Sequence, residues 1–230
     1  NEWGHPKSYL GAGIEQFTLP DGLMAWSMTS KQYIEAAVKI VKALLAEDGR
    51  ELRGSNRPHK GPLPTSYKPE LDTTRECSEE LAYRFRQIIG ILRWAIELGR
   101  FDILLEVSLL SQYQASPREG HLEALYLIVH YLSKNPRKRV VFDPKRPNDQ
   151  SHRFNYLANW KEFYGDVQEE DPPNMPEPLG MPVKISCYVD SNHAGNVVTR
   201  RSHTEIIILV NNAVITVFSK RQNTVESSTF

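Results

Sequence analysis

An aspartate at the predicted end of a β-strand is the residue in this sequence best placed to bind a metal ion. The stretch CYVDSNHAGN begins with strand-forming residues, reaches Asp190 and then changes to small, turn-forming residues. A carboxylate at such a position stands at the rim of a sheet, where it can reach a divalent cation. From these residues alone, turn capping remains the ordinary alternative for a lone aspartate at a strand end.

The histidines and cysteines do not predict a zinc site. His121 and His130 are nine residues apart and do not share a helix face as a metal pair would, and His193 is typical of a turn. Cys77 and Cys187 are far apart and lack ligand spacing, which indicates a reducing compartment. The sequence contains neither a G-x-S-x-G elbow nor a glycine-rich phosphate loop, so no small-molecule cofactor is expected.

Charge and hydropathy restrict the possible partners. The 230 residues include 28 basic and 28 acidic side chains, so any nucleic-acid binding must come from local patches. Arg200-Arg201 and Lys220-Arg221 are candidates for phosphate contacts, although an exposed basic pair between strands also serves solvation. The run Arg137 to Arg139 is better explained by a helix C-terminus. No apolar run is long enough for a membrane span, which predicts an intracellular protein without a membrane partner.

The first two thirds of the chain are expected to hold a β-hairpin followed by helices. Two strand-like runs within residues 8–29 flank the turn signal Leu19-Pro20-Asp21-Gly22. Helical apolar spacing then covers the stretches 29–49, 78–98, 102–114 and 120–135. Thr29 to Gln32 fit a capping box, and Ser116 to Glu119 combine an N-cap serine, a proline and a capping glutamate. Trp26 and Trp94 occupy apolar positions, which favours core packing over base stacking.

A proline-rich segment separates these helices from a second group of strands. Eight of the 15 prolines fall between Pro136 and Pro182, which is typical of a linker. Beyond it lie the strand-like runs KISCYVD, TEIIILVN and AVITVFSK, with the turn signal Asn211-Asn212 between the last two. The fold class is therefore predicted to be α+β, with an N-terminal hairpin, a helical region and an incomplete sheet of about three antiparallel strands.

Several motifs in this order resemble copia-type retrotransposon polyproteins. YVDSNHAG, TRRSHT and SKRQNTVESST are similar to the start of the RNase H domain of that family. IIGILRWAIELGRFDILLEVSLLSQY and PREGHLEALYLIVHYL resemble the segment that precedes it, whose usual form includes R-P-D-I and H-W-x-A, and YLGAGIE resembles the hairpin after the polymerase palm. The resemblance implies a palm-distal hairpin at 1–28, a helical thumb or connection at 29–142, a linker at 143–181 and the start of an RNase H-like domain at 182–230.

The resemblance also implies a chemistry for Asp190. RNase H domains of the family cleave the RNA strand of an RNA/DNA hybrid with acidic residues that hold two Mg²⁺ ions, and Asp190 matches the first of these acids. Two such ions about 4 Å apart require several carboxylates to offset their repulsion. The next acid of the family follows the run Ser227 to Thr229, where this chain ends, and Glu226 does not match it. We therefore expect this chain alone to be inactive.

Three positions depart from the family pattern. Asn192 stands where a second aspartate is common, Glu205 stands where a glycine follows the S-x-T of the second strand, and Phe101 replaces the proline of R-P-D-I. These departures leave two functional hypotheses open. The chain is part of a reverse transcriptase and RNase H polyprotein, or it is a non-catalytic nucleic-acid-binding or protein-binding remnant of a decayed element.

Overall fold

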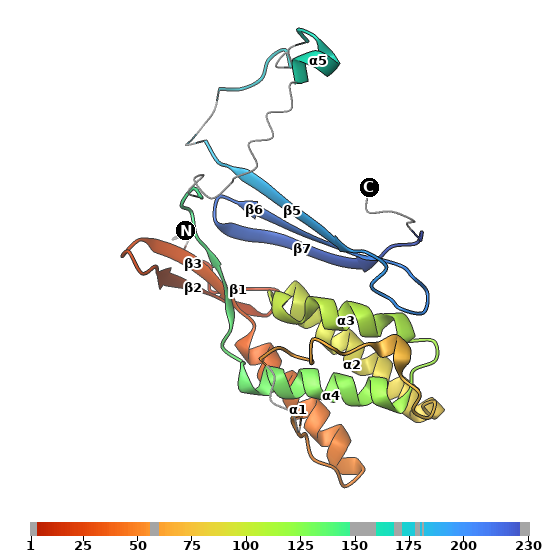
Figure 1. Ribbon diagram of the computed structural model, residues 1–230. Helices are drawn as coiled ribbons and strands as arrows, with labels where there is room; N and C mark the ends of the chain where they lie inside the picture. The colour runs from red at the N-terminus through yellow and green to blue at the C-terminus, as the bar shows by residue number, and fades with distance from the viewer. Residues whose placement is uncertain are drawn as a thin grey trace.

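The computed structural model describes residues 4–55, 60–147, 160–167, 172–177, 180 and 182–225. Two antiparallel sheets are joined by a group of helices, and the C-terminal sheet lies beside α3 (Figure 1). This arrangement confirms the predicted α+β class with three antiparallel strands at the C-terminal end. The domain boundaries inferred from the sequence remain predictions, and the run Ser227 to Thr229 lies outside the described residues.

The predicted N-terminal hairpin is part of a larger sheet. Strands β2 (Ala12–Thr18) and β3 (Met24–Thr29) are joined by the expected turn and pair with each other. β1 (Ser8–Tyr9) pairs antiparallel with β2 on its other edge. The sequence did not predict β4 (Arg139–Phe142), which pairs with β3 on its other side. Arg139 in β4 forms an ion pair of 3.2 Å with Glu15. The strand β4 therefore connects the end of the helical region to the first strands of the chain.

Four helices build the main core, and their apolar faces follow the spacing seen in the sequence. Their bounds are α1 Lys31–Glu47, α2 Glu79–Glu97, α3 Leu104–Leu110 and α4 Glu119–Lys134. Short 3₁₀ turns flank them at η1 Pro69–Leu71, η2 Phe101–Ile103 and η3 Ser111–Tyr113. α2 buries Phe85, Ile88 and Leu92 completely, and α4 does the same with Leu125 and Ile128. Burial of each such side chain contributes roughly 1.5–3 kcal/mol.

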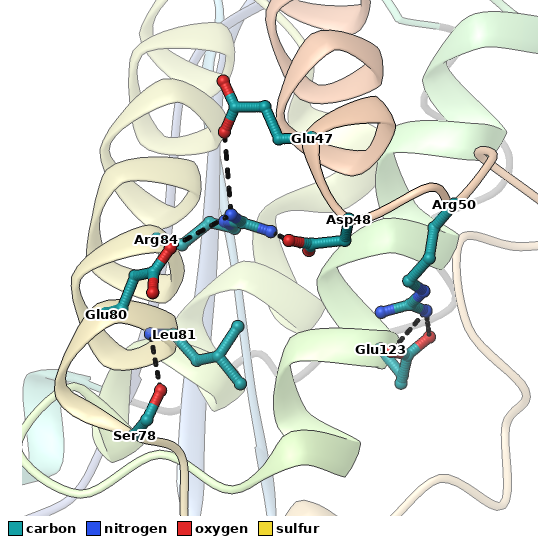
Figure 2. Close-up of polar contacts among 8 residues, drawn as sticks. All are labelled: Glu47, Asp48, Arg50, Ser78, Glu80, Leu81, Arg84 and Glu123. Atoms are coloured by element: carbon teal, nitrogen blue, oxygen red, sulfur yellow. Dashed lines mark hydrogen bonds and ion pairs between the residues drawn. The ribbon is translucent and has the colours of Figure 1, made fainter.

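A buried arginine ties the end of α1 to the start of α2 (Figure 2). The side chain of Arg84 is 5% exposed, and its guanidinium contacts Asp48 directly and lies 3.8 Å from both Glu47 and Glu80. Three carboxylates around one cation compensate the cost of burying it. The Ser78 hydroxyl accepts a hydrogen bond from the Leu81 N–H at 3.3 Å, so the expected start of α2 is confirmed.

The caps of the other two long helices differ from the prediction. Ser30 is the N-cap of α1, but its side chain makes no capping hydrogen bond, so the predicted capping box is wrong. α4 begins at Glu119 with Arg118, rather than Ser116, at the N-cap. The Arg118 N–H donates to His121 Nδ1 at 3.1 Å, and His121 Nε2 lies 2.9 Å from the carbonyl oxygen of Pro69. A buried imidazole thus does what the glutamate was expected to do, because it reaches both the helix start and η1.

The C-terminal sheet has the order β5 (Ile185–Asn192), β6 (His203–Val210) and β7 (Ala213–Arg221). This confirms the three strands predicted beyond the linker, with Asn211 at a positive φ of 53° in the turn. β7 packs beside α3, where the Ser108 hydroxyl donates to the carbonyl oxygen of Ser219 at 2.8 Å. The same hydroxyl lies 3.1 Å from His203 Nε2. The helix therefore occupies part of the edge of β7 that pairing with β6 leaves open.

The predicted linker is described only in part. It contains the short helix α5 (Trp160–Tyr164), which lies away from the rest of the molecule in Figure 1. No helix among the described residues has both the length and the apolar character needed to span a membrane.

Candidate nucleic-acid interface

Asp190 lies near the end of β5 with its side chain exposed. Its Oδ1 accepts a hydrogen bond from the Ser191 N–H at 2.9 Å. Local bonding of this kind is what the turn-capping alternative predicts. Its direct partner across the sheet is Glu205 of β6. Because directly paired residues of antiparallel strands project to the same face, the two carboxylates share one side of the sheet.

Glu205 therefore places a second acid beside Asp190, at the position where the family pattern has glycine. Its Oε1 accepts a hydrogen bond of 3.4 Å from the Ser219 hydroxyl. Burial raises the pKa of Glu106 on α3, and the negative charges of Asp102 and Glu205 raise it further. Even so, the described residues include no group of three or more His, Cys, Asp or Glu side chains placed to hold a metal ion. The assignment of Asp190 as a Mg²⁺ ligand remains a prediction.

Asn192 has a structural role in the turn after β5. Its Oδ1 accepts a hydrogen bond from the His203 N–H at 2.7 Å. A Cβ atom on Gly195 would lie 2.4 Å from Asn192 Nδ2, so glycine allows the loop to close over this amide. The Lys68 ammonium then donates to the Gly195 carbonyl oxygen at 3.0 Å, and Glu70 accepts from the Val197 N–H at the same distance. The loop between β5 and β6 is in this way bound to the segment around η1.

The structure places the four predicted phosphate-binding residues at one end of the C-terminal sheet. Arg200 and Arg201 lie in the loop between β5 and β6, and Lys220 and Arg221 end β7. The two segments are neighbours, because the Gln222 N–H donates to the Ser202 carbonyl oxygen at 2.9 Å. Whether these cations contact nucleic acid remains a prediction, but their proximity gives the sheet a basic end.

The basic run Arg137 to Arg139 contacts acids of the chain itself. Lys138 lies 3.2 Å from Asp102, and Arg139 pairs with Glu15. Two of the three cations are thus held by acids of the chain itself. This supports a structural role for Lys138 and Arg139, whereas the explanation by a helix C-terminus stays a prediction, because α4 ends at Lys134.

The outer face of α2 contains the residues that sequence reasoning missed. Trp94 is 43% exposed and Tyr83 is 66% exposed, so the prediction that Trp94 packs in the core is wrong. From Tyr83 onward the exposed positions of this stripe are Tyr83, Arg86, Gln87, Gly90, Arg93, Trp94 and Glu97. The first six of them are called the α2 outer face below. The helical spacing of two aromatic and two basic residues was visible in the sequence. The apolar spacing of the opposite face is the stronger signal, and it led to the assignment of Trp94 to the core.

Gly90 lies in the middle of the α2 outer face. A glycine inside a helix costs about 1 kcal/mol relative to alanine. Close packing does not explain it here, because a Cβ atom at this position would meet nothing within 4 Å. Exposed aromatic rings beside arginines, with an open backbone between them, form a surface suited to phosphates and to the sugars or bases of nucleic acid.

Trp26, the other tryptophan expected to pack in the core, is half-buried in β3. Its ring lies 5.4 Å from that of His5, and the contact belongs to the N-terminal sheet. His121 and His130 do not form a metal pair, since both ring nitrogens of His121 are within hydrogen-bonding distance of backbone groups.

Comparison with curated proteins relates the chain to retrotransposon Pol polyproteins. The relative that shows this is the "Retrovirus-related Pol polyprotein from transposon RE1" of Arabidopsis thaliana, which is 27% identical over 156 residues, or 68% of this chain. The chain spans 9% of the length of that polyprotein. No family model matches the chain. No solved structure matches the chain with statistical significance.

Proposed function

We propose that the chain is the thumb and connection region of a copia-type reverse transcriptase, followed by the first strands of an RNase H domain. In the complete polyprotein it would act in RNA-directed DNA synthesis and in hydrolysis of RNA in RNA/DNA hybrids. The Pol relationship supports the class of protein. The observation that carries the proposed contact with nucleic acid is the α2 outer face, with exposed Trp94 and Tyr83 beside Arg86 and Arg93.

We propose that the α2 outer face lies in the groove of an A-form-like duplex. From Tyr83 to Trp94 it extends for about 16 Å along the helix. A-form helices present a wide, shallow minor groove with sugar hydroxyls at its surface. Gly90 would let the helix backbone approach that surface, while the guanidinium groups of Arg86 and Arg93, two turns apart on one side of the helix, would reach successive phosphates. Contacts of this kind recognise shape and charge and carry little sequence information.

Photo-crosslinking tests this contact directly. A benzophenone side chain at position 87, in the middle of the α2 outer face, should crosslink to a labelled RNA/DNA hybrid. The matched control places the same group at position 43, which is exposed on α1 and outside the proposed surface. Equal crosslinking from both positions, or crosslinking from neither at low salt, would contradict the proposal.

For the C-terminal sheet we propose that Asp190 contributes one ligand to a Mg²⁺ site and that Glu205 adds a second carboxylate beside it. Two Mg²⁺ ions need more acids than these two. We therefore expect the 230-residue chain to leave an RNA/DNA hybrid intact in the presence of Mg²⁺. Cleavage that disappears in Asp190→Asn would show that a complete site is present. The chain would then be a nuclease in its own right.

The second candidate is a non-catalytic nucleic-acid-binding remnant of a decayed element. Asn192 favours it, because the amide is engaged by the His203 N–H and offers one negative charge fewer at the rim. This hypothesis predicts hybrid binding that weakens with salt and does not change when Mg²⁺ is removed by chelation. A Mg²⁺-dependent affinity that Asp190→Asn abolishes would favour the catalytic interpretation.

A further inference from the structure

A groove of about 520 Å³ lies between the helices and the outer strand of the C-terminal sheet. α2 contributes Arg93 and Glu97 to its walls, and the end of β7 contributes Lys220 and Arg221. Its apolar part is formed by Leu104, Val107 and Val217. The groove therefore begins at the α2 outer face and continues toward the basic end of the sheet.

Within the part of the chain that the structure describes, the cations of this groove have no acidic partners. Arg93, Lys220 and Arg221 make no ion pair within 4.0 Å among the described residues, whereas Arg84, Lys138 and Arg139 elsewhere in the chain are all paired. Glu97 is the single acid among the lining residues. Three cations line one groove with one acid to balance them, and this excess of positive charge attracts an anionic ligand.

The serine hydroxyls that line the groove form hydrogen bonds within the protein. The Ser108 hydroxyl donates to the Ser219 carbonyl oxygen, and the Ser111 hydroxyl donates to that of Val107 at 2.6 Å. Gln112 Oε1, in contrast, is buried and has no hydrogen-bond partner among the described residues. This oxygen is shielded from solvent, so it offers no direct contact to a ligand in the groove.

The volume of the groove and the contacts at the edge of β7 favour one class of ligand over others. A volume of about 520 Å³ suits a ligand of one or two nucleotides and not a duplex. An extended peptide would bind best by pairing with the open edge of β7. The bond from Ser108 to the Ser219 carbonyl oxygen already occupies part of that edge. A single phosphodiester strand needs cations and an apolar surface, and both are present.

We propose that this groove binds a single nucleic-acid strand, with Arg93, Lys220 and Arg221 at its phosphates and the apolar part against a base or sugar. The inference rests on the proposed function, because the strand would be one that leaves a duplex bound at the α2 outer face. In this proposal Lys220 and Arg221 bind the same ligand as Arg93 of α2, which is about 130 residues earlier in the chain.

The test uses the full 230-residue chain and a fluorescent oligothymidylate of about ten nucleotides. Binding is followed by anisotropy between about 50 and 200 mM salt, where each lost phosphate contact lowers the slope of log affinity against log salt by about 0.7. Lys220→Gln should lower it by about 0.7, and Lys220→Gln with Arg221→Gln by about 1.4. The control is Lys39→Gln with Lys42→Gln, which removes two exposed cations of α1. Lys220 is exposed, so its single variant tests the groove even if the half-buried Arg221 is needed for folding.

Single-strand binding that is unchanged in Lys220→Gln and in the double variant would overturn the inference. Binding of a polyglutamate peptide with the same dependence on Lys220, in place of the oligothymidylate, would overturn it in favour of an acidic peptide. If position 87 crosslinks to the hybrid while the groove variants bind single strands normally, the groove inference fails and the proposed function stands. If the chain binds neither hybrid nor single strand at low salt, both fail.

Discussion

Buried polar side chains hold the junctions between the helices. Arg100 is 1% exposed and forms hydrogen bonds of 2.9 Å to both carboxylate oxygens of Asp102. The same carboxylate accepts from the Tyr131 hydroxyl at 2.8 Å and pairs with Lys138. Burial works against ionisation of Asp102, yet the hydrogen bond and charge of Arg100 lower its pKa. Arg100 and Asp102, which follow α2, thus link the end of that helix to α4 and to the residues before β4.

Gly120 is the residue at which a single methyl group should damage the fold. A Cβ atom there would lie 2.0 Å from Asp72 Oδ2, in a loop where Asp72 also accepts from the Thr74 N–H and hydroxyl. Gly120→Ala should lower the free energy of unfolding by about 1–3 kcal/mol, in spite of the better helix propensity of alanine. Urea unfolding measures this. Equal or higher stability of the variant would show that the loop around Asp72 yields without cost.

At the scale of elements, α2 combines a core face with a surface proposed for binding. Gly90→Ala should raise the free energy of unfolding by about 0.5–1 kcal/mol, because nothing obstructs the new methyl group. The same change should weaken hybrid binding, since it keeps the helix backbone away from the duplex. Urea unfolding and hybrid titration on the same preparation check both. A variant that is stabilised and binds as well as the wild type would show that Gly90 does not face nucleic acid.

Periodicity and turn chemistry were sufficient to predict most elements. The hairpin, the long helices and the three C-terminal strands follow from alternating or helical apolar spacing. Gly99, with a φ of 93°, follows the end of α2. β4 was missed because four residues carry too little alternation and because pairing with β3, more than 100 residues away, defines it. The start of α4 was misplaced because the partner of the cap is a histidine whose second nitrogen contacts η1.

The candidate site was predictable only in part for the same reason. Asp190 and the basic pairs were found from their local sequence. The cross-strand contact of Asp190 with Glu205, and the groove shared by Arg93 and Lys220, depend on packing between distant segments.

At the scale of the whole molecule, His203 connects the C-terminal sheet to the helical region. The Ser108 hydroxyl uses its proton for the Ser219 carbonyl oxygen, so His203 Nε2 donates to the Ser108 oxygen. Burial lowers the pKa of His203, and the positive charge of Arg221 lowers it further. The unfolded chain therefore binds a proton more readily than the folded one, and stability is retained above pH of about 6.5 and lost as the pH falls below it.

We expect the melting temperature to decrease between pH 7.5 and pH 5.5 and His203→Gln to reduce this dependence, since a glutamine amide can donate to Ser108 without titrating. Some dependence should remain, because burial and the charges of Lys134 and Lys42 also lower the pKa of His130. Thermal melts of both proteins over this range measure it. Parallel curves for the wild type and His203→Gln would contradict the role given to His203.

The central claim is that the α2 outer face binds duplex nucleic acid, and the salt dependence of hybrid binding tests it most directly. Arg86→Gln with Trp94→Ser should lower the affinity for an RNA/DNA hybrid by about 10-fold or more and reduce the slope of log affinity against log salt by about 0.9, as one lost phosphate contact requires. The control Lys39→Gln, which removes one cation from the exposed side of α1, should leave the affinity close to that of the wild type. Equal affinities and slopes for the wild type and the α2 variant would contradict the account.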